Sequence, residues 1–384
     1  MNKFEYYNPT RILFGEGQIL RINKLIPEKD RVLVLYGGGS AKRTGTLDEV
    51  LSALGSCEIF TFGGIEPNPE YDTLIKAVEL IKKEKIDFLL AVGGGSVIDG
   101  TKFIAAAVFI DDPWQILKTF GKIITKALPF GTVLTIPATG SEMNSGSVIT
   151  RREKKTKLPF SNPLLFPSFS ILDPSKSLTL PPRQVANGIV DAFVHITEQY
   201  LTFPADAKVQ DGYSEALLNI LINEGPLALS EPQNMSVRAN LMWTATMALN
   251  GLIGAGVPSD WSTHMIGHEI TALYGIDHAR TLAVVLPGLW HVLRKEKKEK
   301  LLQYAKHVWK ISKGNEDERI YEAITRTENF FISLDIPVRL KDYDLDETHI
   351  EEIINQLKAH GMTALGENRN ITPEIVKAIL LNRL

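Results

Sequence analysis

The chain has 384 residues, which is enough for two domains that each bury a core of their own. Its 44% hydrophobic and 23% charged residues are typical of a globular protein, and 42 basic against 45 acidic residues give a net charge of −3. No basic run is interleaved with aromatic residues, which speaks against nucleic acid as a partner. The longest unbroken apolar run, 103–110, is too short to cross a bilayer.

A single cysteine, Cys57, excludes an internal disulfide framework and fits a reducing compartment. The N-terminal segment contains Lys3, Glu5 and Arg11 and lacks the apolar core of a secretory signal. We therefore expect a cytoplasmic protein that does not enter a membrane.

The first half of the chain alternates strand and helix patterns. A helical spacing of apolar residues runs through 71–85. The strand patterns are short apolar runs at 31–36, 58–62, 87–92 and 132–136. Continuous apolar strands with helical crossovers predict a parallel sheet that is covered on both faces. Two further stretches, near 6–14 and 146–150, are expected to be edge strands.

The pattern changes at Pro181-Pro182, because proline restricts the residue before it and tolerates only the start of a helix. Long helical patterns then follow at 183–200, 205–222, 236–251, 263–274 and 299–313. The sequence therefore predicts an α/β domain over 1–180 and a helical domain over 181–384.

One glycine run, Gly93-Gly-Gly-Ser96, follows a predicted strand and opens a helix that continues through Lys102. Glycines let a phosphate approach the backbone, and the helix N-terminus offers N–H groups and a positive dipole. This segment suits a pyrophosphate, although a tight turn without a ligand has the same pattern.

A second glycine run, Gly37-Gly-Gly-Ser40, follows the first predicted strand. The G-x-G-x-x-G fingerprint is absent because position 42 is Lys. No acidic side chain ends either of the first two strands to hold a ribose 2′-hydroxyl. Ser40, Lys42 and Arg43 suit a 2′-phosphate instead, which favours NADP(H) over NAD(H).

Four of the eight histidines lie near one another in two runs of the second half. Asp191 and His195 are spaced i, i+4, which places both on one face of a helix with apolar flanks. His264 and His268 form a second such pair, and His278 follows. Imidazole and carboxylate suit divalent zinc or iron, and one Asp with three His leaves a coordination position open for a substrate oxygen. A surface pair or a helix cap is the simpler alternative for each pair taken alone.

Five motifs in order give the chain a recognisable pattern. It resembles the iron-containing alcohol dehydrogenases, and within them the branch of NADPH-dependent butanol dehydrogenases and broad aldehyde reductases. The motifs that carry the resemblance are residues 8–15, GGGSVIDGTK at 93–102, PATGSE at 137–142, LPPRQVANGIVDAFVHITEQY at 180–200 and HMIGHEITALYGIDHA at 264–279.

The resemblance implies a fold shared with dehydroquinate synthases. An N-terminal α/β domain with a parallel, Rossmann-like sheet would bind the dinucleotide, and an all-helical C-terminal domain would bind Fe²⁺ or Zn²⁺ in the cleft between the two. The implied metal ligands are Asp191, His195, His264 and His278.

The resemblance also implies where the cofactor binds. The implied contacts are Gly94, Gly95, Ser96 and Asp99 at the pyrophosphate and ribose, Thr139 and Ser141 near the nicotinamide, and Gly38, Gly39 and Ser40 near the adenosine 2′ position. Lys157 either contacts the cofactor as well or lies in a solvated turn.

The implied activity is hydride transfer between a nicotinamide cofactor and small aldehydes or primary alcohols such as butanal and butanol. His268 is a candidate for relaying a proton, or it orients His264 or a water molecule. Trp261 and Met265 either form an apolar substrate wall or belong to the core. A dehydroquinate synthase-like lyase and a non-catalytic NADP-binding redox sensor remain as alternatives. A homodimer is a further expectation from the family.

Overall fold

The computed structural model describes all 384 residues of the chain. The chain forms two compact units, each built from more than one segment. The sheet unit comprises Tyr7–Leu180 and Gln233–Thr246, and the helical unit comprises Met1–Tyr6, Pro181–Pro232 and Met247–Leu384. None of the helices combines the length and the apolar composition that a membrane span requires. The division into domains 1–180 and 181–384 stays a prediction.

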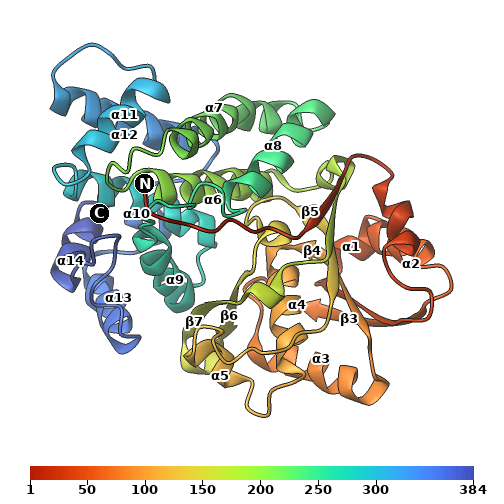
Figure 1. The fold of residues 1–384 in the computed structure, drawn as a ribbon. Helices are drawn as coiled ribbons and strands as arrows, with labels where there is room; N and C mark the ends of the chain where they lie inside the picture. The colour runs from red at the N-terminus through yellow and green to blue at the C-terminus, as the bar shows by residue number, and fades with distance from the viewer. The chain divides into compact units, whose positions relative to one another are not determined.

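Six parallel strands organise the sheet unit (Figure 1). In chain order they are β1 (Arg11–Phe14), β2 (Arg31–Gly37), β3 (Glu58–Ile65), β4 (Phe88–Gly94), β5 (Phe130–Ile136) and β8 (Phe169–Leu172). The order across the sheet is β1-β8-β5-β4-β2-β3, so β5 and β4 are central and β1 and β3 are the edges. The helices between the strands are α1 (Ser40–Arg43), α2 (Thr46–Ala53), α3 (Tyr71–Glu84), α4 (Gly95–Ala107) and α5 (Trp114–Lys118).

Both faces of this sheet are covered. Leu33 and Leu89 belong to a buried cluster with α3 and α4 on one face, and Val34 and Leu90 belong to a second cluster with α2 on the other. Successive side chains of a strand point to opposite faces. A central strand such as β4 therefore needs apolar residues at nearly every position, which explains its continuous apolar run.

Two smaller elements complete the sheet unit. An antiparallel pair, β6 (Gly146–Arg151) and β7 (Thr156–Ser161), follows the segment after β5. Helix α8 (Met235–Ala248) belongs to the sheet unit through Thr246, and its Met242 is buried in the same cluster as α3 and α4.

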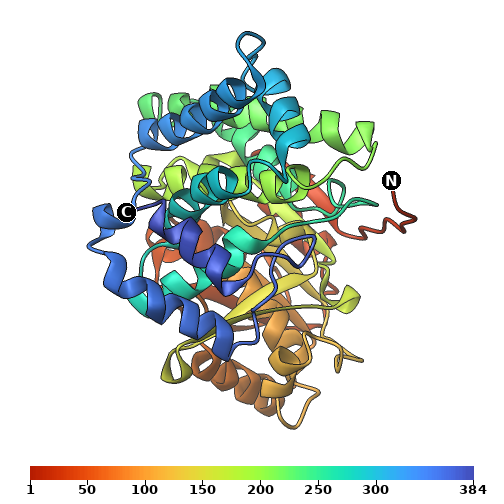
Figure 2. The same cartoon turned by 90° about the vertical axis from the view of Figure 1, so that its left-hand side faces the viewer.

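The helical unit is built around α6, α9 and α10, which pack on one another. The last two helices of the chain, α13 and α14, are dark blue in Figure 2. Gly267 of α9 lets α10 approach closely, because a Cβ at this position would lie 2.9 Å from Thr281 Oγ1. The helices are α6 (Pro182–Tyr200), α7 (Lys208–Ser230), α9 (Ser262–Tyr274), α10 (His278–Val292), α11 (Lys298–His307), α12 (Glu316–Ser333), α13 (Glu347–Ala359) and α14 (Pro373–Leu381).

The predicted fold class is confirmed: a parallel sheet covered by helices is followed by a helical region. Some bounds were wrong. Helix α7 continues through Pro226 to Ser230 instead of ending at residue 222, while α11 ends at His307, before the left-handed Lys310 with φ 57°. Helix α10 was not predicted because Pro287 lies inside it.

Candidate functional site

Helix α6 carries the first two residues of the predicted metal site. Pro182 lies in its first turn, where an N–H would lack an intrahelical partner in any case. Asp191 and His195 stand four residues apart and are only 4% and 5% exposed. Both side chains therefore lie in the interior of the helical unit and share one side of α6.

The structure brings all four predicted ligands together. Helix α9 supplies His264, and His278 is the first residue of α10. Oδ1 of Asp191 is their common neighbour, because three imidazole Nε2 atoms lie 3.9 Å from it: those of His195, His264 and His278. The ligand atoms of Asp191, His195 and His264 all lie within 4.8 Å of one another, a compact group that suits one divalent ion.

The chemistry of this donor set fits a metal. The buried Nε2 of His264, which faces Asp191, has no hydrogen-bond partner, whereas buried polar atoms are normally paired. Burial lowers the pKa of His195 to about 4, so this imidazole is neutral at physiological pH, as a ligand must be. Imidazole and carboxylate donors together suit Zn²⁺ or Fe²⁺.

Glu198 is a site residue that the sequence analysis missed. Its Oε2 contacts Nδ1 of His264, and its Oε1 accepts a hydrogen bond of 2.6 Å from the backbone N–H of Thr263. A carboxylate on Nδ1 fixes the ring so that Nε2 is turned toward Asp191. Burial by itself lowers the pKa of His264, but the carboxylates of Glu198 and Asp191 outweigh burial and raise it. The spacing 191, 195, 198 on one helix face was the available signal.

His268 lies one helical turn after His264 and is 4% exposed. Its ring centroid is 4.7 Å from that of His278 and 6.1 Å from that of His264. The predicted proton-relay residue is therefore beside the ligand cluster.

Trp261 packs against the same imidazoles. Its ring centroid lies 5.4 Å from that of His264 and 6.2 Å from that of His195. The residue is half-buried and has a left-handed backbone with φ 63°, which is rare for a bulky side chain. Met265 is also half-buried. Trp261 thus forms a wall of the histidine cluster, at a cost in backbone strain.

The predicted cofactor loops follow two neighbouring parallel strands, β2 and β4. Gly38 and Ser40 are exposed, and Gly39 has a left-handed φ of 102° at the start of α1. Because β2 and β4 run in the same direction, the two loops that follow them lie at the same edge of the sheet.

The glycines at the start of α4 have a packing role inside the protein. A Cβ on Gly95 would lie 2.4 Å from Thr139 Oγ1, and one on Gly94 would lie 2.9 Å from Ile136 Cβ. The first turn of α4 therefore packs directly on the segment after β5. Ser96 Oγ accepts a hydrogen bond of 3.3 Å from the backbone of Asn68.

Asp99 and Ser141 are hydrogen-bonded to each other, at 2.6 Å. Lys102, which the sequence analysis did not single out, donates to Ser141 Oγ at 2.8 Å, to Asn144 Oδ1 at 2.9 Å and to Gly146 O at 2.7 Å. Burial lowers the pKa of Lys102 to about 8, against the opposing charge of Asp99. This buried network holds the segment after β5 on α4.

Lys157 lies in β7, opposite Thr150 of β6, and is 5% exposed. Burial raises the pKa of Asp99, and the charges of Lys102 and Lys157 oppose that shift. Lys157 is therefore within electrostatic reach of Asp99 and does not lie in a solvated turn.

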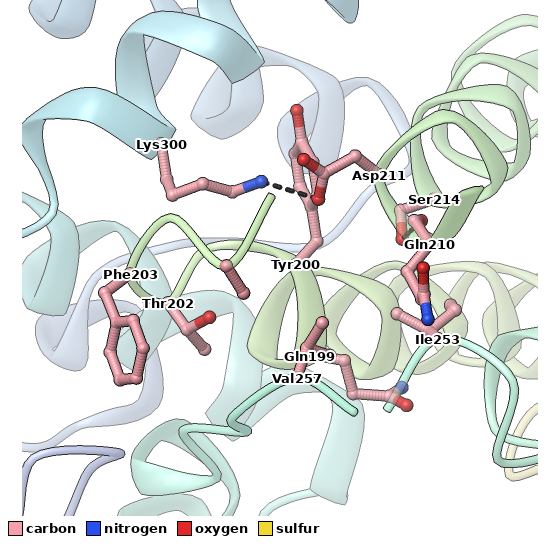
Figure 3. A pocket seen from close by; sticks show the side chains of 11 residues that line it. Gln199, Tyr200, Thr202, Phe203, Gln210, Asp211, Ser214, Ile253, Val257 and Lys300 are labelled. Atoms are coloured by element: carbon pink, nitrogen blue, oxygen red, sulfur yellow. Dashed lines mark hydrogen bonds and ion pairs between the residues drawn. The ribbon is translucent and has the colours of Figure 1, made fainter. Parts of the chain in front are cut away.

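A separate polar pocket lies at the end of α6 (Figure 3). Lys300 Nζ lies 4.0 Å from the centroid of the Tyr200 ring and donates to Asp211 Oδ1 at 2.7 Å. Gln199, also in its lining, donates to His195 O at 2.7 Å. None of the predicted ligands lines this pocket, and its charged groups are paired with one another, so we regard it as structural.

Comparisons with known proteins identify the family of the chain. The sequence matches the profile of iron-containing alcohol dehydrogenases over residues 9–174 and that of the C-terminal region of the Fe-containing alcohol dehydrogenase family over residues 185–384. The chain is 57% identical over 382 residues to the NADPH-dependent aldehyde reductase YqhD of Escherichia coli, with 99% of each chain covered. It is 41% identical to the probable NADH-dependent butanol dehydrogenase 1 of Bacillus subtilis, again with 99% of each covered.

Solved structures show the same fold. The substrate- and cofactor-free aldehyde reductase YqhD of E. coli superposes with a TM-score of 0.94 at 55% identity, with 100% of both chains covered. The NADH-dependent butanol dehydrogenase A of Thermotoga maritima gives a TM-score of 0.96 at 34% identity, covering 100% of this chain and 99% of that one. The chain therefore belongs to the iron-containing alcohol dehydrogenase family and is an NAD(P)-dependent alcohol dehydrogenase.

Proposed function

We propose that this protein is a metal-dependent aldehyde reductase that uses NADPH to convert small aldehydes such as butanal to primary alcohols, and that it catalyses the reverse oxidation. The observation that carries the proposal is the arrangement of three imidazole Nε2 atoms at 3.9 Å around Oδ1 of Asp191. No observation favours the lyase or the redox sensor.

Asp191, His195, His264 and His278 would hold one Fe²⁺ or Zn²⁺. The bound ion would supply Lewis-acid stabilisation of the negative charge that develops on the carbonyl oxygen. A bound nicotinamide cofactor would supply the hydride for the carbonyl carbon, so redox chemistry would be left to the cofactor.

His268 would deliver the proton that the substrate oxygen takes up after hydride transfer, because an imidazole exchanges protons near neutral pH. Its position beside the rings of His264 and His278 supports this role. His268→Ala is expected to lower turnover about 10²- to 10⁴-fold. An unchanged turnover across the pH range would leave His268 only an orienting role.

The cofactor is proposed to bind over the loops that follow β2 and β4. Gly94, Gly95, Ser96, Asp99, Thr139, Ser141 and Lys157 are proposed contacts, as are Gly38, Gly39 and Ser40. The exposed Ser40, Lys42 and Arg43 support NADPH over NADH, since they offer a hydroxyl and two cations to a 2′-phosphate. Among the relatives, the E. coli reductase is NADPH-dependent and the B. subtilis enzyme is described as NADH-dependent.

Small apolar aldehydes are the proposed substrates. The indole of Trp261 against His264 and His195 supports an apolar wall beside the ligand cluster.

A homodimer in the cytoplasm stays a prediction. The edge position of β1 and the exposed side chain of Phe14 support a subunit contact there. Sedimentation velocity would test it, and a monomer at micromolar concentration would contradict it.

The reaction itself is tested by butanal reduction, followed as loss of nicotinamide absorbance with NADPH and NADH in parallel. We expect turnover that favours NADPH. Preference for NADH would refute the 2′-phosphate assignment and keep the dehydrogenase, whereas no turnover with either cofactor in metal-loaded protein would refute the proposed reaction.

A further inference from the structure

We propose that Asp277 is a positioning residue that fixes His278 against the ligands on α6, through Arg183 and Asn187. The inference rests on the proposed metal site. Asp277 directly precedes His278 and is the N-cap residue of α10. Contacts that fix Asp277 therefore also fix the backbone position from which the His278 side chain extends.

The first observation is that Asp277 does not cap its own helix. Aspartate at an N-cap normally accepts a hydrogen bond from a backbone N–H of the first turn. Asp346 does so at the start of α13, where it accepts from Thr348 N at 2.9 Å. The side chain of Asp277 makes no such bond, and the start of α10 gives up that stabilisation.

The second observation is where the Asp277 carboxylate goes instead. Its Oδ2 accepts from Arg183 Nε at 2.8 Å and from Asn187 Nδ2 at 2.9 Å. Both donors belong to α6, and their spacing of four residues continues to Asp191 and His195 on the same face. Asp277 is therefore tied to the helix face that carries two of the ligands, one turn before the first of them.

The third observation is the position of His278. It stands at the first position of α10, and its side chain is 21% exposed, compared with 6% or 7% for the other three ligands. First turns of helices open more readily than helix interiors. On the α9 side, Thr281 Oγ1 donates to His278 O at 2.7 Å and lies 3.1 Å from Gly267 O. The two hydrogen bonds from Arg183 and Asn187 to Asp277, called the Asp277 tether from here on, supply the matching restraint on the α6 side.

Charge around the tether is consistent with a geometric role. Arg183 is 58% exposed and Asp277 is 34% exposed, so solvent screens their ion pair and limits its effect on overall stability. Arg280 adds a second cation, with Nε 3.9 Å from Asp277 Oδ2. Loss of the tether should therefore loosen His278 more than it destabilises the fold.

The test compares Asp277→Ser, Asp277→Asn and Asp346→Ser with the wild type. Serine is a good N-cap residue but is too short to reach α6, so Asp277→Ser removes the bonds to Arg183 and Asn187 while leaving a residue that can cap α10. Asparagine keeps an oxygen that Arg183 and Asn187 can bind and removes only the charge. Asp346→Ser is the matched control, at an N-cap that has no link to the ligands.

Two properties of the full-length protein are measured: the melting temperature of the metal-free form, and the Zn²⁺ dissociation constant by competition with a chromogenic chelator. We expect Asp277→Ser to melt close to the wild type and to bind Zn²⁺ about 10- to 100-fold more weakly. Asp277→Asn should lie between the two, and Asp346→Ser should bind like the wild type.

Equal Zn²⁺ affinity in the wild type and Asp277→Ser would overturn the inference and leave the metal site standing. Weakened Zn²⁺ binding in Asp346→Ser to the same extent would also overturn it, because the effect would then reflect general stability. A wild type that does not bind Zn²⁺ would instead refute the proposed metal site on which the inference rests.

Discussion

At the scale of single residues, the buried contact between Glu198 Oε2 and His264 Nδ1 holds one proposed ligand in a defined orientation. Removing the negative charge of Glu198 should leave the His264 ring less well oriented and its Nε2 a weaker metal ligand. We expect Glu198→Gln to weaken Zn²⁺ binding about 10- to 100-fold in a chelator competition assay.

A carboxylate outside the site provides the control for Glu198. Asp211 pairs with Lys300 in the pocket of Figure 3, and Asp211→Asn should leave Zn²⁺ affinity unchanged. If Glu198→Gln binds Zn²⁺ as tightly as the wild type, Glu198 has no part in ligand orientation.

Substitutions at two glycines, Gly95 and Gly38, should have different effects, one on packing and one on cofactor binding. A Cβ on Gly95 would lie 2.4 Å from Thr139 Oγ1, whereas one on Gly38 would meet no atom within 4 Å. In urea unfolding, Gly95→Ala should lower the free energy of unfolding by about 1–3 kcal/mol. Gly38→Ala should unfold like the wild type but raise KM for NADPH. An unchanged KM in Gly38→Ala would remove Gly38 from the cofactor site.

At the scale of elements, α9 and α13 are linked by His360, whose Nδ1 lies 2.7 Å from Glu269 Oε1. This hydrogen bond raises the pKa of His360 above its ordinary 6.5, against the opposing effect of burial. The folded protein therefore binds the proton more tightly than the unfolded chain does. The resulting stabilisation is complete below pH 6.5 and is lost as the pH rises through the folded-state pKa.

The expected result is that the wild type exceeds His360→Gln in free energy of unfolding by more at a pH well below 6.5 than at one well above it. Chemical denaturation of both proteins at the two pH values measures this difference. A difference that does not change with pH would contradict the ion pair.

The element scale also shows what the sequence could and could not predict. Asp191 and His195 were recognisable because an i, i+4 pair within an apolar run must lie on one buried helix face. The partner of His264 could not be recognised in this way, because Glu198 lies 66 positions away in the sequence. The same holds for Asp277, whose partner Arg183 lies 94 positions away. Such contacts depend on how α6, α9 and α10 pack.

At the scale of the whole molecule, the parallel sheet and the helical region followed from the apolar strands and the helical periods. The short strand β8 did not, because its four residues give too little periodicity to recognise. The first six residues belong to the helical unit although the strands follow them directly, and no local pattern signals that placement.

The central proposal is that Asp191, His195, His264 and His278 hold the ion on which aldehyde reduction depends. The most direct measurement removes metal stepwise with a chelator and records, on the same samples, metal per chain by elemental analysis and butanal turnover with NADPH. Turnover should fall in proportion to bound metal and return when Zn²⁺ or Fe²⁺ is restored. Full turnover in metal-free protein would contradict the proposal.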